Sequence, residues 1–241
     1  MGKGHPHRSL FLYNVGRSRS RANPSMSFTK IIERTANHVK AALSGDGSGH
    51  DWWHIERVWR MAKRIGHVEG ADMLVVELAA LLHDIADWKA HGGDSSIGPT
   101  MAMDWLTSLG LDSNIIQHVG QIIADISFKG AGVEEPVLSL EGQIVQDADR
   151  LDAIGAIGIA RAFAYGGAKG RTIYDPATKP AEHRTSEEFL KSDGTTINHF
   201  YEKLLLLKDR MNTATGRAIA ERRHRFMEDY LQRFYEEWEG G

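Results

Sequence analysis

The most constraining feature of this 241-residue sequence is an apolar segment that ends in an imidazole and a carboxylate. Residues 74–82 are apolar except at Glu77, and His83 and Asp84 follow directly. An apolar stretch of this length without a polar face indicates a helix buried in a core. His83 and Asp84 then reach the interior, where a carboxylate needs a cation or hydrogen-bond donors. Two interpretations follow: the pair holds a divalent metal, or it is a core histidine beside a capping carboxylate.

A second stretch supplies further imidazoles. His50 and His54 are four residues apart at the start of a segment with an apolar stripe at helical spacing. His54 borders that stripe and is the better candidate for a ligand, whereas His50 and Asp51 are placed to orient it. The alternative is that both histidines lie on an ordinary helix surface.

A third stretch, residues 141–161, sets three aspartates among small and apolar residues. The small side chains predict a tightly packed helix interface, so these carboxylates lie close to the core. Asp149 and Asp152 are three residues apart and share a helical face, while Asp147 points away from Asp149. One of the three is the natural carboxylate to complete a site with two histidines and two aspartates.

Composition excludes several other classes of protein. The chain has no cysteine, which excludes disulfides, thiolate nucleophiles and cysteine-based zinc sites. No long uncharged apolar span exists, so a membrane-spanning protein is not expected. A net charge of -3 argues against a protein that coats nucleic acid, but it is compatible with a basic pocket for a phosphorylated small molecule. Because no secretory signal is seen, the expected compartment is the cytoplasm.

Helical spacing and stop signals divide the chain. Residues 1–25 are basic, lack acidic residues and show little periodicity, which predicts a disordered extension. Its expected origin is a vector or a start codon assigned too early, with a transit peptide as the alternative. Residues 26–238 form one domain, in which the pattern predicts helices at residues 28–42, 50–69, 72–82, 99–109, 112–126, 197–211 and 215–238, besides the stretch 141–161.

Taken in order, His54, His83-Asp84 and Asp149 resemble the ligand set of the HD-domain metal-dependent phosphohydrolase superfamily. Their surroundings are similar to the small bacterial HD-type nucleoside triphosphate pyrophosphohydrolases; the segments that carry this similarity are residues 50–58, 83–88, 127–130 and 146–155. The resemblance covers roughly residues 26–238. It implies an all-α fold, a single HD-domain helical bundle with a metal site between helices.

The resemblance also assigns roles to residues. It implies that His54, His83, Asp84 and Asp149 bind the metal, and that Asp87, together with Asp84, is catalytic by handling a proton or positioning water. Asp87 is followed by Trp88, whereas HD-type hydrolases of guanosine tetraphosphate carry paired acids there. The Gly-Tyr-Pro signature of cyclic-di-GMP phosphodiesterases is also missing, so neither activity is expected.

Other charged and polar residues are candidates for substrate contacts or for orienting the ligands. Cations near the site would hold phosphate oxygens, and the candidates are Lys89, Lys129, Arg150, Lys169 and Arg171. The alternative for each of the loop lysines and arginines is a solvated surface charge. Residues expected to support the ligands are His50, Asp51, Asp147, Asp152 and His118.

The expected activity is hydrolysis of a phosphate ester or anhydride with Mn²⁺ or Mg²⁺, or with Fe²⁺, Co²⁺, Ni²⁺ or Zn²⁺. The preferred reaction cleaves a nucleoside triphosphate to the monophosphate and pyrophosphate. Alternatives are a phosphatase of nucleoside monophosphates, another HD phosphomonoesterase, a catalytically idle nucleotide-binding protein, and a helical scaffold without metal. The expected partner is a small-molecule nucleotide or other phosphorylated substrate, with no membrane and no polymeric nucleic acid, and a homodimer is left open.

Overall fold

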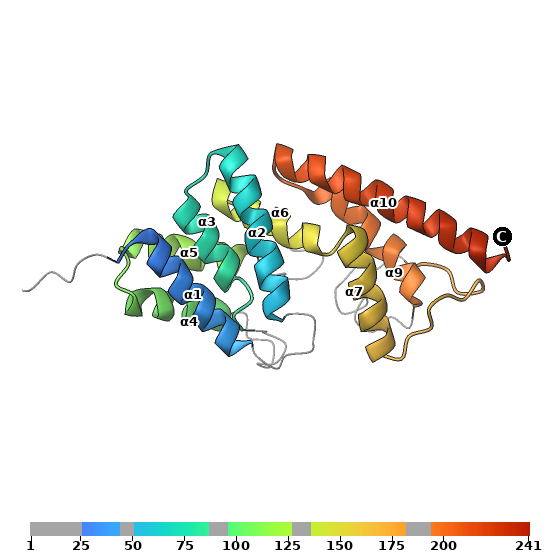
Figure 1. Ribbon diagram of the computed structural model, residues 1–241, viewed down its shortest axis with the longest axis horizontal. Helices are drawn as coiled ribbons and strands as arrows, with labels where there is room; N and C mark the ends of the chain where they lie inside the picture. Colours follow the sequence, from blue (N-terminus) through green and yellow to red (C-terminus); the bar gives the residue numbers. More distant parts are fainter. Residues whose placement is uncertain (1–25, 44–50, 87–95, 127–135, 182–193) are drawn as a thin grey trace, which may run out of the picture.

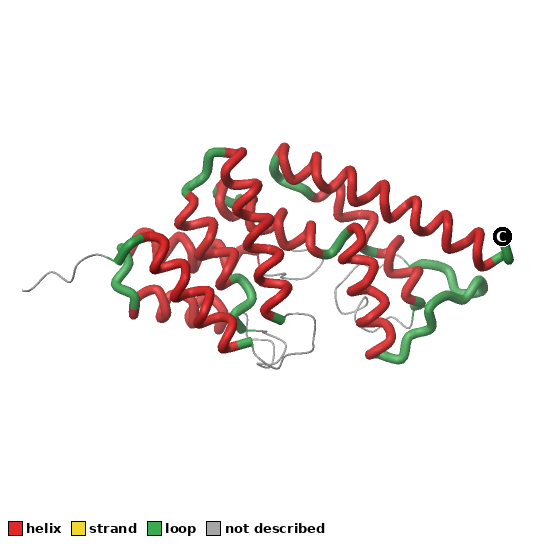
Figure 2. The backbone as a smooth tube through the Cα atoms, in the orientation of Figure 1, coloured by secondary structure: helices red, strands yellow, loops and turns green. Residues whose placement is uncertain are grey.

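The computed structural model describes residues 26–43, 51–86, 96–126, 136–181 and 194–241, and in these parts it contains helices and no strand (Figure 2). This confirms the all-α expectation. In chain order the described helices are α1 (Phe28–Ala42), α2 (Trp52–Glu69), α3 (Met73–Leu82), α4 (Ile97–Ser108), α5 (Ser113–Ile126), α6 (Leu140–Asp152), α7 (Gly155–Ala168), α9 (Thr196–Glu202), the 3₁₀ helix η1 (Leu204–Arg210) and α10 (Ala214–Trp238). None of the described helices is long and apolar enough to cross a membrane.

Helix α6 lies between two groups of helices (Figure 1). Helices α1 to α5 pack on one side of it, and α7, α9 and α10 extend away on the other. Helix α6 contacts α2, α3 and α5 in the first group and α7 and α10 in the second. It therefore joins the two groups, which also meet directly where α2 contacts α10.

Helix α3 runs through the centre of the first group, as its apolar sequence predicts. All residues from Val75 to Leu82 are buried. Even Glu77 is only 6% exposed, because Trp59 Nε1 donates a hydrogen bond of 2.8 Å to its carboxylate and Lys63 Nζ lies 3.5 Å away. The helix ends at Leu82 with His83 as its C-cap, so the buried core element delivers this histidine to the end of a helix.

Capping residues fix where α2 begins and ends. Asp51 caps its first turn by accepting a hydrogen bond of 3.0 Å from the His54 backbone N–H. Gly70 ends it with φ of 74°, a left-handed conformation that favours glycine. Asp72 then caps α3 by accepting hydrogen bonds from the amides of Leu74 and Val75. Both ends of α2 are therefore fixed, which sets the position of His54 in the first turn of the helix.

Two stretches that the sequence pattern predicts as continuous are divided. The chain turns between α6 and α7 at Gly155, which has φ of 78°. A Cβ atom at this position would lie only 3.0 Å from the Arg223 side chain. Residues 197–211, predicted as one helix, break at Lys203 (φ −144°) into α9 and the 3₁₀ helix η1. The tighter 3₁₀ turn places Leu204 and Leu207 on one side, and both are buried.

Candidate metal centre

Three side chains from three different helix ends or turns converge on one point. His54 comes from the first turn of α2, His83 from the end of α3, and Asp149 from the last turns of α6. One donor atom of each lies within 4.8 Å of the others. Asp149 Oδ1 is 3.4 Å from His54 Nε2 and 4.0 Å from His83 Nε2. The structure thus brings together three of the four ligands expected from the sequence.

Asp84 approaches the same group from the residue after His83. Its Oδ2 atom is 3.9 Å from His54 Nε2. The two histidine side chains are nearly buried, at 2% and 6% exposed, whereas those of Asp84 and Asp149 are 24% and 47% exposed. The imidazoles therefore form the inner side of the group, and the carboxylates lie on its open side.

Hydrogen bonds at the other ring nitrogen orient both imidazoles. His54 Nδ1 lies 2.8 Å from Asp152 Oδ2, and His83 Nδ1 lies 2.9 Å from the Ala80 carbonyl oxygen. An acceptor at Nδ1 keeps the proton there and leaves the Nε2 lone pair to bind a cation. Both Nε2 atoms are thereby aimed at the point where the carboxylates meet them.

Asp152 is itself held by two arginines. Arg57 Nε and Nη2 donate to its two oxygens at 2.7 and 3.0 Å, and Arg161 Nη1 donates at 2.8 Å. Burial of this carboxylate favours its neutral form, but the hydrogen bonds from His54 and Arg57 and the charge of Arg161 lower its pKa far below the ordinary value. Asp152 is therefore an ionised, rigidly held acceptor for the His54 ring.

The group fits a divalent cation. His83 Nε2 is buried and has no hydrogen-bond partner within the described chain, which is a costly arrangement unless a ligand occupies that lone pair. Two neutral imidazole nitrogens with carboxylate oxygens are a donor set that Mn²⁺, Fe²⁺ and Zn²⁺ accept.

Of the residues expected to support the ligands, Asp51 and Asp152 lie beside them. Asp51 accepts from the backbone N–H of His54, as described above. His118 instead lies on α5, where its Nε2 is 2.9 Å from Ser139 Oγ and 3.7 Å from Glu141. His50 lies outside the described residues.

Asp147 faces the beginning of α10 and not the metal group. Its Oδ1 accepts from the backbone and side-chain amides of Asn212 at 2.8 and 2.9 Å, and its Oδ2 accepts from the amide and hydroxyl of Thr213, both at 2.8 Å. A Cβ on Gly216 would collide with Oδ2, so a glycine permits this close approach. Asp147 is thus placed to attach α10 to α6.

The cations expected at the substrate have different positions. Arg150 Nη1 donates to the carbonyl of Arg210. Lys169 and Arg171 lie past the end of α7, where each approaches the ring of Tyr165 at 5.7 Å. About 20 Å of helix separates that end from Gly155. The remaining candidates, Asp87, Lys89 and Lys129, lie outside the described residues.

Arg57 and Arg161 are the parts of this centre that the sequence argument did not select. Arg57 is three residues after His54, so both side chains leave α2 on one face, and this spacing is a signal that sequence reasoning could use. Arg161 gives no comparable signal, because its position depends on the turn at Gly155 that returns α7 toward Asp152.

Comparison with known proteins agrees with this geometry. Residues 52–154 match the HD domain family. The Bacillus subtilis protein YpgQ is 41% identical over 209 residues, which are 86% of this chain and 93% of that protein. An HD-superfamily hydrolase from Bacillus thuringiensis superposes with a TM-score of 0.72 at 44% identity, over 89% of this chain and 100% of that one. Bacillus subtilis YpgQ in complex with ADP superposes with a TM-score of 0.70 at 38% identity, over 88% and 97%. This chain therefore belongs to the HD domain family and is a metal-dependent phosphohydrolase.

Proposed function

We propose that this phosphohydrolase acts on nucleotides and cleaves a nucleoside triphosphate to the monophosphate and pyrophosphate. The observation that carries the nucleotide assignment is the ADP complex of YpgQ, a protein whose structure matches 88% of this chain. A charged, open group of acids and imidazoles that holds a divalent metal is the kind of site that binds the phosphates of such a ligand.

In this proposal His54, His83, Asp84 and Asp149 hold the metal, with Mn²⁺ or Mg²⁺ preferred. A divalent metal supplies Lewis-acid activation of water and neutralises charge on the phosphoryl oxygens. The chain itself orients the two imidazoles, since Asp152 and the Ala80 carbonyl lie at their Nδ1 atoms and leave Nε2 to face the metal. This rigidity positions the reacting groups before the substrate arrives.

The water oxygen attacks the α-phosphorus, the bond from that phosphorus to the bridging oxygen breaks, and pyrophosphate leaves. A carboxylate must accept the proton that the water loses. We assign that role to Asp87, three residues after Asp84, and we assign positioning of the water to Asp84. Lys89 and Lys129 are proposed to neutralise the phosphates.

The test is metal analysis of the purified protein, followed by measurement of pyrophosphate and orthophosphate release from a panel of nucleotides with added Mn²⁺. We expect about one metal per chain and pyrophosphate as the product. Asp84→Ala is expected to lower the rate by roughly 10³-fold or more, because it removes a carboxylate from the metal group. Asp229→Ala, which removes an exposed acid of α10, is the matched control and should act as wild type.

Each result has a distinct meaning. Orthophosphate release from nucleoside monophosphates would replace the pyrophosphohydrolase by a phosphatase. Metal and nucleotide binding without turnover of any nucleotide in the panel would contradict the proposed reaction. A protein that takes up no divalent metal at all would contradict the assignment of the four ligands.

A further inference from the structure

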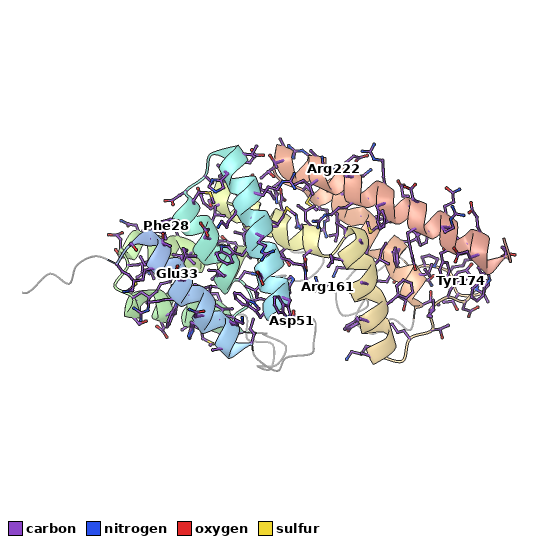
Figure 3. All side chains as sticks on the ribbon, viewed as in Figure 1. Phe28, Glu33, Asp51, Arg161, Tyr174 and Arg222 are labelled. Carbon is purple, nitrogen blue, oxygen red and sulfur yellow. The ribbon has the colours of Figure 1, made fainter. Side chains whose placement is uncertain are left out.

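A hollow rich in arginine lies between α2, the start of α7 and α10. Two adjoining cavities of about 280 and 330 Å³ share Arg64 and Arg223 among their lining residues. Arg57 and Arg60 also line the first cavity, and Arg222 lines the second. We call this hollow the arginine groove, defined by Arg57, Arg60, Arg64, Arg222 and Arg223. Figure 3 labels Arg222 on the part of α10 that faces α2.

Two of these five guanidinium groups are paired with acids. Arg57 is bonded to Asp152, and Arg60 donates to Glu56 one turn earlier on α2. Within the described parts of the chain, neither Arg64, Arg222 nor Arg223 forms an ion pair with a carboxylate. The groove therefore carries more guanidinium groups than carboxylates, and Asp152 is the acid that lines it.

Arg223 is held among charges of both signs. Burial lowers the pKa of Arg223; the negative charge of Asp152 opposes this shift, and repulsion from Arg64 and Arg222 adds to it. Arg223 Nη1 donates to the Leu151 carbonyl, which holds the side chain in place beside Gly155. Like charges held together in this way are relieved by an anion that several guanidinium groups share.

The groove also has backbone N–H groups and apolar side chains that can contact a ligand. The first turn of α7 enters it at Gly155 and Ala156, and no side chain caps the free N–H groups of that turn. Ile157 lines both cavities and Phe226, which is 50% exposed, lines the second. A ring or another apolar group can lie on these side chains while phosphate oxygens meet the arginines.

The arginine groove and the metal group are formed by different residues. None of His54, His83, Asp84 or Asp149 lines either cavity. The two places touch through Asp152, which lines the first cavity and bonds Nδ1 of His54 on the side of the ring opposite to the metal group. A ligand in the groove would therefore lie behind the histidine and not in front of it.

We propose that the arginine groove is a second binding site for a phosphate-bearing small molecule, with its phosphates on Arg64, Arg222 and Arg223 and its apolar part on Ile157 and Phe226. This site is distinct from the catalytic metal group and does not require metal. Its ligand is a nucleotide or another organic phosphate of that size, which the two cavities together can accommodate.

The test uses the full chain in EDTA, so that binding at the metal group is not supported, with ADP as the probe and calorimetry at low salt as the measurement. Wild type is expected to bind ADP, and the double variant Arg64→Gln/Arg222→Gln is expected to bind ADP at least about 10-fold more weakly. Both replaced side chains are exposed and have no described bond, so the double variant should fold as wild type does. The control Arg34→Gln/Arg225→Gln removes the same charge from exposed positions outside the groove and should bind as wild type.

Phe226→Ala sharpens the assignment of the apolar part. This variant should bind ADP at least about 3-fold more weakly, whereas inorganic pyrophosphate, which has no ring, should bind as it does to wild type. The proposal is overturned if wild type binds no ADP in EDTA, or if the groove variant binds ADP as tightly as wild type. Equal weakening in the groove variant and the control would also overturn it, since it would show only an effect of net charge.

Discussion

Two faces of helix α6 carry aspartates in opposite situations. Asp147 is fully buried, and its two oxygens accept four hydrogen bonds from Asn212 and Thr213 at the start of α10. Asp149, two residues later, is half exposed and faces the Nε2 atoms of His54 and His83. When the Nδ1 atoms of these rings carry the hydrogen, Nε2 has a lone pair and cannot donate a hydrogen bond to Asp149. The comparison teaches that the acid with complete protein partners holds the fold, and the acid left incomplete is available for a ligand.

The largest expected effect is on the incomplete face. Asp149→Ala should remove the metal from the purified protein and lower phosphohydrolase activity by roughly 10³-fold or more, because the site loses the carboxylate that both imidazoles face. Its unfolding free energy without metal should change by less than about 0.5 kcal/mol, since no described donor loses a partner. Metal analysis, product release and urea unfolding in EDTA check these three quantities. A variant that keeps its metal would contradict the division between the two faces.

The matching change on the other face should show the reverse. Asp147→Ala removes four hydrogen bonds and takes the acceptors from the partly buried amide of Asn212 and the buried amide of Thr213. The free energy of unfolding, measured in urea, should therefore fall by about 3 kcal/mol. The variant that remains folded should still bind metal. Asp229→Ala, an exposed acid on α10, is the control and should change stability by less than about 0.5 kcal/mol. Loss of metal with unchanged stability would show that Asp147 belongs to the site instead.

Asp152 combines the properties of Asp147 and Asp149. Its oxygens have protein hydrogen-bond donors, and it also orients the proposed metal ligand His54. Asp152→Asn keeps the shape but loses the charge that holds His54 and the two arginines. Affinity for Mn²⁺ should fall about 10- to 100-fold, which a competition titration with a chelator measures. Stability should also fall, since Arg57 and Arg161 lose their ionised partner. Unchanged Mn²⁺ affinity would show that the His54 ring needs no anchor.

Sequence reasoning went furthest where the chemistry is local. The apolar run before His83 predicted the buried helix. The resemblance to HD-domain proteins selected His54, His83 and Asp149, which the structure brings together. Sequence reasoning failed for Asp147 because a helical wheel says which way a side chain points but not which distant segment lies there. The division at Gly155 and the break at Lys203 also depend on tertiary packing, so Arg161 and the arginine groove were not visible in the pattern.

A histidine of the second group of helices provides the last and smallest test. His199 on α9 is mostly buried near Lys203 and Arg171, and burial followed by the repulsion of these cations lowers its pKa to about 4. The His54 ring, by contrast, has the anionic Asp152 at its Nδ1. His199 therefore stays neutral in the folded protein at pH values where the same histidine is already protonated in the unfolded chain.

The sign of the pH effect follows from this difference. Between pH 6.5 and about 4 the unfolded chain binds a proton at His199 that the folded chain refuses, so stability falls as the pH decreases through that window and is complete above it. From pH 7 to pH 5 this histidine should account for about 1 to 2 kcal/mol of lost unfolding free energy. His199→Gln should remove that part of the pH dependence, measured by urea unfolding in EDTA at both pH values. His118→Gln, at a more exposed position, should leave the pH dependence close to that of wild type, and an equally flat profile in both variants would contradict the assignment to His199.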